Sequence, residues 1–206
     1  MLETITQSTP AHDVAHSGNH DERHDERKLI YARLMVASTN QPNDDALACM
    51  LASLSLGSGD MPVRLGLDEA QYTEMLTTHY PGIDMNKFSI AKAEEKIDRS
   101  DEQGELFELL YVNKADSDPS RKWMAQIVVA GCMGGNHLWQ DLGLWCREDL
   151  TRLMETNFPE LALRNDKNMK WKKFLYKQLC VQEGIYTCRA PSCEVCVDYA
   201  SCFAPE

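Results

Sequence analysis

The residues in this sequence best suited to chemistry are four cysteines in its last twenty positions. They follow the pattern Cys188-x4-Cys193-x2-Cys196-x5-Cys202 and make up half of the eight cysteines in the chain. Thiolates that lie close together in sequence can converge on one point, which a soft metal centre or an iron–sulfur cluster requires. The spacing therefore predicts a metal or cluster site in a loop that spans residues 181–206.

Two other interpretations of these cysteines remain open. A zinc site is the first, although the gaps of four and five residues differ from the paired Cys-x2-Cys steps of common zinc sites. These gaps also differ from the Cys-x2-Cys-x2-Cys run of bacterial ferredoxins. Disulfides are the second alternative, although eight cysteines in 206 residues are fewer than a small secreted scaffold carries. Residues 1–8 have neither the basic start nor the apolar core of a signal peptide. We therefore expect a cytoplasmic protein whose thiols stay reduced.

The elements that must position this loop are predicted to be helices over residues 28–180. Apolar residues recur at helical spacing in segments near 30–37, 44–56, 68–80, 106–111, 123–131, 142–154 and 166–180. Asp68 with Gln71 predicts a capping box, and Gly57 predicts a helix end. The polar residues 84–103 are expected to form a loop or a short exposed helix. Because no segment alternates with period two over a useful length, the predicted fold class is all-α, a helical bundle followed by the cysteine-rich metal-cluster loop.

The last predicted helix, residues 166–180, has two contrasting faces. One is apolar and carries Trp171, Phe174 and Leu175. The other is basic and carries Lys167, Lys170, Lys173 and Lys177. In a chain of net charge −11, the basic face is either a solvated surface or a surface that attracts an anion, such as a metal oxyanion or an acidic partner.

Residues 1–27 are polar and are expected to form a disordered tail. Their histidines recur every four residues, at His12, His16, His20 and His24. On a helix these imidazoles would line one face and could bind nickel, zinc or copper. Gly18 opposes a helix there, so a polar tail without a metal site is the favoured interpretation.

Composition and motifs also argue against several classes of function. The net charge of −11 argues against general binding to nucleic acid. The sequence shows no P-loop, no dinucleotide-binding fingerprint and no nucleophile paired with a base, so an enzyme is the weakest interpretation. No stretch is long and apolar enough to predict a membrane helix.

The motifs between about residues 120 and 203 together resemble the NifQ family of nitrogen-fixing bacteria. The resemblance is carried by the cysteine pattern that ends at Phe203, by Met169-Lys-Trp-Lys-Lys-Phe174, and by His137-Leu-Trp-Gln-Asp-Leu-Gly-Leu144. It implies an iron–sulfur protein that supplies molybdenum during assembly of the nitrogenase iron–molybdenum cofactor. The implied partners are the scaffold NifEN, the nitrogenase iron protein and a molybdenum source such as molybdate. The implied ligands of the molybdenum–iron–sulfur cluster are Cys188, Cys193, Cys196 and Cys202.

His137 is a further candidate ligand within the motifs that carry the resemblance. It follows a Gly-Gly pair and precedes Asp141. His137 either caps the next helix or lies near the molybdenum corner as a ligand or proton partner, with Asp141 supporting it. Of the remaining four cysteines, the first three in sequence are expected to be buried thiols on apolar helical stretches and the last a core thiol at a helix end. They are Cys49, Cys132, Cys146 and Cys180.

Two functional hypotheses of different classes follow. The first is a carrier, not an enzyme, that holds a molybdenum–iron–sulfur cluster on the four C-terminal cysteines and donates molybdenum. The second is a protein-interaction module in which the same cysteines bind one zinc ion and the basic helix docks a partner. Metal and sulfide content distinguishes the two.

Overall fold

The computed structural model describes residues 18–84 and 100–183, and every regular element in these two ranges is helical. The elements are α1 (Gly18–Ala37), α2 (Asp44–Ser55), the 3-10 helix η1 (Val63–Gly66), α3 (Glu69–His79), α4 (Ser100–Val112), α5 (Pro119–Cys132), α6 (Leu138–Asp141), α7 (Arg147–Asn157), α8 (Pro159–Arg164) and α9 (Trp171–Glu183). The all-α prediction is confirmed, whereas the predicted cysteine-rich loop lies outside the described residues. None of the described helices combines the length and apolar character needed to cross a membrane.

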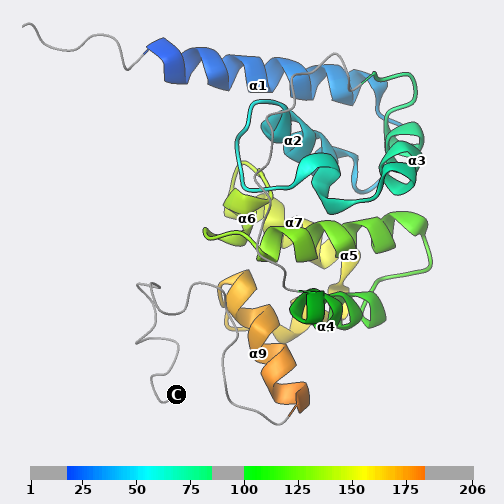
Figure 1. Ribbon diagram of the computed structural model, residues 1–206, viewed down its shortest axis with the longest axis vertical. Coiled ribbons are helices and arrows are strands. Elements are labelled where there is room, and N and C mark those ends of the chain that lie inside the picture. The colour runs from blue at the N-terminus through cyan, green and yellow to red at the C-terminus, as the bar shows by residue number, and fades with distance from the viewer. Residues whose placement is uncertain (1–17, 85–99, 184–206) are drawn as a thin grey trace, which may run out of the picture.

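The helices are stacked in layers along the long axis of the molecule (Figure 1). The helix α1 lies at one end, above α2 and α3, and α4 and α9 lie at the other end, with α5 between them. The core centres on α2 and α5, which are buried around most of their circumference because apolar residues occur on all sides of both helices. The other helices bury one face each and cover this core.

The helix α3 shows that local sequence signals set its boundaries as predicted. The Asp68 carboxylate accepts a hydrogen bond from the backbone N–H of Gln71 at 2.8 Å. The Gln71 side chain in turn accepts one from the backbone N–H of Asp68 at 3.2 Å. This capping box satisfies two N–H groups that the first turn of a helix leaves unpaired, so α3 begins directly after Asp68.

The N-terminal boundary differs from the prediction. Residues 1–27 were expected to form a disordered tail, but α1 begins at Gly18. The prediction is therefore wrong for residues 18–27, which are helical. Helix propagation costs little once Ile30 and Leu34 are buried against the core. The Arg27 guanidinium also lies 5.0 Å from the centre of the Trp145 ring, and this contact holds the polar half of α1 onto the body.

Residues 142–154, predicted as one helix, are interrupted. The chain leaves α6 through Gly143, whose φ of +72° lies in the left-handed region that favours glycine. A side chain at Gly143 would also collide with Ser53, whose hydroxyl donates to the Gly143 carbonyl at 2.6 Å. The helix α7 starts only at Arg147, because this bend is required for Leu142 and Leu144 both to be buried.

The helix α9 also starts later than predicted, at Trp171 instead of residue 166. Asn168 has a φ of +51°, which a continuous right-handed helix does not allow. The Asn165 side chain closes the turn, since it accepts from the Met169 N–H at 2.8 Å and donates to the Met169 carbonyl at 3.1 Å. Lys167 and Lys170, the first lysines of the segment, therefore precede the helix.

Candidate metal centre and the helix that leads to it

The four predicted cluster ligands Cys188, Cys193, Cys196 and Cys202 lie outside the described residues. The element that leads to them is α9, which ends at Glu183, five positions before the first of these cysteines. Within residues 18–84 and 100–183, no group of three or more His, Cys, Asp or Glu side chains is arranged to hold a metal ion. The described part of the chain therefore offers single donors and a scaffold, and the scaffold is best examined around His137.

His137 is exposed and occupies the residue before the first turn of α6. Its backbone N–H donates to the Gln140 side chain at 3.2 Å, so the main chain at this position is fixed. The prediction that Asp141 supports the imidazole finds no counterpart among the contacts of Asp141. The alternative interpretation, that His137 caps the next helix, is confirmed, because His137 is the N-cap residue of α6 and forms a capping box with Gln140. His137 lies exposed at the end of a short turn formed by Gly135, Asn136 and His137, which we call the His137 turn.

Asp141 points in the other direction, into the protein. Its carboxylate is fully buried and accepts hydrogen bonds from the backbone N–H and the side-chain amide of Asn136, both at 3.1 Å. It also accepts from the ammonium group of Lys172 in α9. The correction has a simple physical reason: a buried carboxylate requires a cation and several donors, which Lys172 and Asn136 provide and an exposed imidazole does not.

Lys172 is the described residue that sequence reasoning missed. Its side chain is only 12% exposed, and its ammonium donates to the Gly134 carbonyl at 2.8 Å as well as to Asp141. Among the five lysines between residues 167 and 177, it is the one that the sequence pattern assigned to neither face of the predicted helix. Helical spacing contained the signal, since Lys172 adjoins Trp171 and is four residues before the buried Tyr176.

The next turn of α9 makes a second polar contact with the rest of the protein. The Tyr176 hydroxyl donates to the Glu102 carboxylate of α4, one turn further along α9 than Lys172.

Cys132, at the end of α5, is fully buried, and burial raises the pKa of its thiol to about 12, with a smaller opposing effect from Lys172. Cys132 is therefore a protonated thiol of the core, as predicted.

The other cysteines of the described region differ in exposure. Cys49 is buried in α2, and burial raises the pKa of its thiol to about 12, as expected for a thiol of the core. Cys146 is partly exposed at the start of α7, so the prediction that it is buried is wrong. Cys180 is also partly exposed, near the end of α9.

The apolar face of α9 is confirmed. Trp171, Phe174 and Leu175 are each at most 5% exposed. The Trp171 indole N–H donates to the Thr151 hydroxyl of α7 at 3.4 Å. Trp139 and Trp145 are partly buried against the core, so both indole rings contribute to its packing. The helix is thus held by α4, α7 and the residues around α6 at once.

The basic face keeps three of its four predicted lysines. Lys170 immediately precedes α9, and Lys173 and Lys177 follow at helical spacing, whereas Lys167 lies in the turn before the helix. We call Lys170, Lys173 and Lys177 the basic face of α9. Lys177 is exposed and the other two are half-buried.

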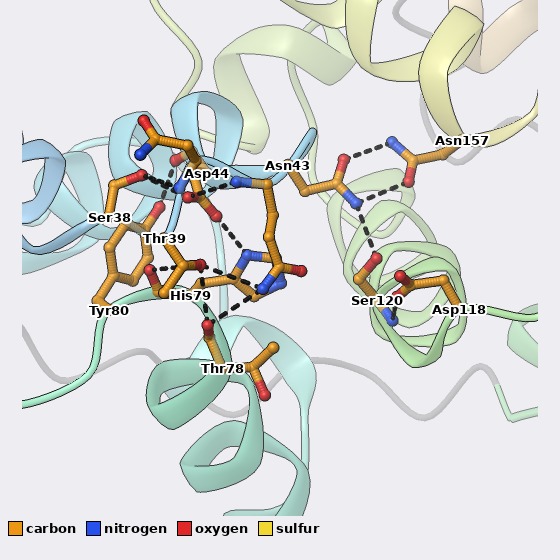
Figure 2. A network of polar contacts seen from close by, with 12 residues as sticks. Ser38, Thr39, Asn43, Asp44, Thr78, His79, Tyr80, Asp118, Ser120 and Asn157 are labelled. Carbon is orange, nitrogen blue, oxygen red and sulfur yellow. Dashed lines mark hydrogen bonds and ion pairs between the residues drawn. The ribbon is translucent and has the colours of Figure 1, made fainter.

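A separate buried network connects the loop between α1 and α2 to the end of α3 (Figure 2). The His79 imidazole lies 2.5 Å from the Asp44 carboxylate, and both side chains are almost inaccessible to solvent. The same carboxylate accepts from the Ser38 hydroxyl and from the backbone N–H of Gln41 at 2.9 Å. Because no substrate reaches a pair this deeply buried, we assign the network a structural role.

The neighbouring network in Figure 2 fastens α2 to α5 and α7. The Asn43 and Asn157 side chains exchange two hydrogen bonds of 2.9 and 2.8 Å, and Asn43 also donates to the Ser120 hydroxyl at 3.3 Å. All three residues are buried, so these bonds replace the hydrogen bonds to water that the same groups make in the unfolded chain. The amide pair sets how the ends of the three helices meet.

Comparison with known proteins places these features in a family. Residues 46–204 match the model of the family described as NifQ. Protein NifQ of Azotobacter vinelandii is 47% identical over 160 residues, which cover 73% of this chain and 82% of the relative. Protein NifQ of Rhodobacter capsulatus is 34% identical over 78% of this chain and 87% of the relative. Protein NifQ of Klebsiella pneumoniae is 36% identical over 155 residues, which cover 71% of this chain and 90% of the relative. No solved structure matches the chain.

Proposed function

This chain belongs to the NifQ family, and on that premise we propose that it carries molybdenum and donates it to assembly of the nitrogenase iron–molybdenum cofactor. The single observation that supports this proposal most strongly is the family match over residues 46–204, because that range includes all four C-terminal cysteines. The protein acts as a carrier and not as an enzyme. Its cargo is a molybdenum–iron–sulfur cluster.

We assign the cargo to Cys188, Cys193, Cys196 and Cys202. Thiolates are the ligands that iron–sulfur clusters take, and three of them suffice for three iron corners of a cuboidal cluster. The fourth corner then carries molybdenum, completed by the remaining thiolate or by a nitrogen or oxygen ligand.

The chemistry of the described donors supports this assignment. Cys49 and Cys132 are buried, and the pKa of each thiol is raised to about 12, so neither supplies a thiolate near neutral pH. No described group of side chains is arranged to hold a metal by itself. These observations favour the C-terminal cysteines as the source of the soft donors, and His137 adds an exposed imidazole.

We further propose that His137 is the nitrogen ligand of the molybdenum corner. His137 suits this role because it is exposed and follows directly after the Gly134–Asn136 segment. Lys172 of α9, the helix that leads toward the C-terminal cysteines, contacts that segment through the Gly134 carbonyl.

Delivery requires a receiving protein, which we propose to be the cofactor-assembly scaffold NifEN acting with the nitrogenase iron protein. Molybdate or another molybdenum compound is the proposed source. The basic face of α9 contrasts with the net charge of −11 of the whole chain. It suits attraction to an acidic receiver or to an anionic form of molybdenum.

Replacement of the four cysteines tests the proposed function. Cys188→Ala, Cys193→Ala, Cys196→Ala and Cys202→Ala should each lower the cluster content of anaerobically purified protein, while far-ultraviolet circular dichroism stays unchanged. Cys146→Ala is the matched control, because this thiol is partly exposed and lies outside the pattern. Full iron occupancy in all four variants would refute the assignment. Colourless protein with one zinc per chain would favour the interaction module, which no observation on the described residues supports.

A further inference from the structure

Three buried polar atoms without a hydrogen-bond partner lie where η1, α3 and α5 meet. They are Nε of Arg64, the hydroxyl oxygen of Tyr72 and Oε1 of Gln126, and none has a partner within residues 18–84 and 100–183. A buried polar group without a partner costs free energy, so such groups are rare in folded proteins. Three of them at one place therefore indicate a site for a polar ligand. We call the place formed by Arg64, Tyr72 and Gln126 the η1 junction.

The packing of α5 places Gln126 at this junction. Each of η1, α3 and α5 contacts the other two. On α5, Trp123, Gln126 and Ala130 recur at helical spacing and therefore share one face. At one end of this face, Trp123 meets the His79 ring of α3, with 6.0 Å between the ring centroids. At the other end, a Cβ on Gly66 of η1 would lie 2.6 Å from the Ala130 Cβ. Gln126 thus lies between the contact with α3 and the contact with η1.

Tyr72 brings its hydroxyl to the same junction from α3. It lies two turns before His79 on the buried face of this helix and is 7% exposed. Burial raises the pKa of the Tyr72 phenol to about 12, and the nearby Arg64 guanidinium opposes this shift. Near neutral pH the hydroxyl therefore keeps its proton and is a hydrogen-bond donor close to a cation.

The backbone of η1 holds Arg64 in a conformation that residues with a side chain rarely adopt. Arg64, Leu65 and Gly66 have φ angles of +60°, +57° and +82°, so three consecutive residues lie in the left-handed region. Full burial of Leu65 offsets this strain. The turn thus anchors Leu65 in the core and leaves the adjacent Arg64 half-buried at a fixed place.

The charge of Arg64 is not balanced by a carboxylate of the described region, where the ion pairs join other residues. The closest carboxylate in sequence, that of Asp68, accepts from the backbone N–H of Gln71 and caps α3 instead. A guanidinium and a hydroxyl that both donate, beside an amide that can turn either its oxygen or its NH2 inward, suit an anion with several oxygens.

We propose that the η1 junction binds a small tetrahedral oxyanion through Arg64, Tyr72 and Gln126. The guanidinium and the hydroxyl donate to separate oxygens of the anion, and the Gln126 amide donates to a third. Molybdate, sulfate and phosphate share this chemistry, and molybdate is the one that a molybdenum carrier would receive. The choice of molybdate rests on the proposed function, whereas the site itself rests on the described residues alone.

Isothermal titration calorimetry of the full-length protein with sodium molybdate, sodium sulfate and sodium phosphate, at matched ionic strength, tests the site. We expect molybdate to bind one to one. Arg64→Gln and Tyr72→Phe each remove one hydrogen bond to an anion and should weaken binding about tenfold or more. Gln126→Ala should weaken it less, because the amide is neutral. Arg33→Gln is the matched control, since it removes the same charge from an exposed position of α1 and should leave binding unchanged.

The thermal stability of Tyr72→Phe distinguishes a ligand site from a structural role. Without the anion, this variant should melt at or above the wild-type Tm, because its missing hydroxyl had no partner to lose. Saturating molybdate should raise the Tm of the wild type and raise that of the variant less. A Tm well below that of the wild type without the anion would show that the hydroxyl already has a partner, and the inference would fail.

The remaining outcomes are equally decisive. No binding of any of the three anions, or equal binding by the wild type and Arg64→Gln, would overturn the site. Tighter binding of sulfate or phosphate than of molybdate would support the site and overturn the choice of molybdate. The iron and molybdenum content of the purified protein tests the proposed function separately, so failure of one is distinguishable from failure of the other.

Discussion

Two adjacent glycines offer a direct test of the contacts beneath the His137 turn. Gly134 is buried against Asp141, and a Cβ at this position would lie 2.4 Å from the carboxylate carbon and 2.5 and 2.7 Å from its oxygens. Gly135 is exposed, and a Cβ there would meet nothing within 4 Å. Gly134→Ala and Gly135→Ala are thus the same chemical change at neighbouring positions with opposite surroundings.

The expected cost of Gly134→Ala follows from what must move. The Asp141 carboxylate cannot rotate away without breaking its bonds to Lys172 and Asn136. Overpacking costs about 1–3 kcal/mol, and disruption of a buried ion pair costs about 3–5 kcal/mol. We expect a loss of about 3 kcal/mol. Gly135→Ala should change stability by about 1 kcal/mol or less, since it mainly restricts the unfolded chain.

Urea unfolding followed by circular dichroism measures both variants against the wild type. For a chain of this length, about 3 kcal/mol corresponds to a decrease in Tm of roughly 6–12 °C. The reasoning would be refuted by equal stabilities of the two variants, because the only difference between them is the carboxylate beside Gly134.

Three further predictions concern the same core and helix. Trp171→Ala should cost roughly 3–5 kcal/mol in chemical unfolding, because it empties a site where the side chain is 5% exposed; a loss below about 1 kcal/mol would contradict the burial of this residue. Burial raises the pKa of the Cys49 and Cys132 thiols from about 9 to about 12, so the folded state keeps protons that the unfolded state releases as pH rises above 9. Stability should therefore be complete below pH 9 and fall by roughly 1.4 kcal/mol per thiol by pH 10, and equal unfolding free energies at pH 8 and pH 10 would contradict this. Reversal of the three charges of the basic face to Glu should leave helix content unchanged but reduce molybdenum delivery, and wild-type delivery should weaken with salt; normal, salt-insensitive delivery would show that this face is only solvated.

The features that the sequence could predict are those set by nearby residues. The capping box of α3 depends on two side chains three positions apart, and the apolar face of α9 depends on helical spacing. The buried α2 likewise follows from Leu47, Met50, Leu51 and Leu54. In each case, the local pattern and the tertiary packing favour the same structure.

The features that the sequence could not predict depend on partners far along the chain. The bend at Gly143 exists because Ser53, ninety positions earlier, packs against it. Helical spacing places Lys172 beside the buried face of α9, but nothing near it in sequence reveals that Asp141 and the Gly134 carbonyl accept from its ammonium. Asp44 and His79, which also pair, are 35 positions apart. Periodicity reports which residues share a face of a helix, but not which polar groups meet across helices.

The same distinction between local patterns and contacts across the structure applies to the candidate site. The cysteine pattern predicts a ligand set that lies outside the described residues, and His137 is a candidate ligand because of its place after the glycine pair. Of the two alternatives for His137, capping of α6 is confirmed, whereas support of the imidazole by Asp141 is not observed, because that carboxylate pairs with Lys172 and Asn136. The structure instead separates the exposed imidazole from the buried carboxylate by the main chain of the turn.

The central claim is that this chain carries molybdenum within a sulfur- and iron-containing cluster. Molybdenum K-edge X-ray absorption on the anaerobically purified wild-type protein tests it most directly, because the spectrum reports the atoms that surround the metal. The account predicts sulfur and iron neighbours, with a lighter nitrogen or oxygen ligand that changes in His137→Ala. Protein without molybdenum, or molybdenum surrounded only by oxygen, would contradict it.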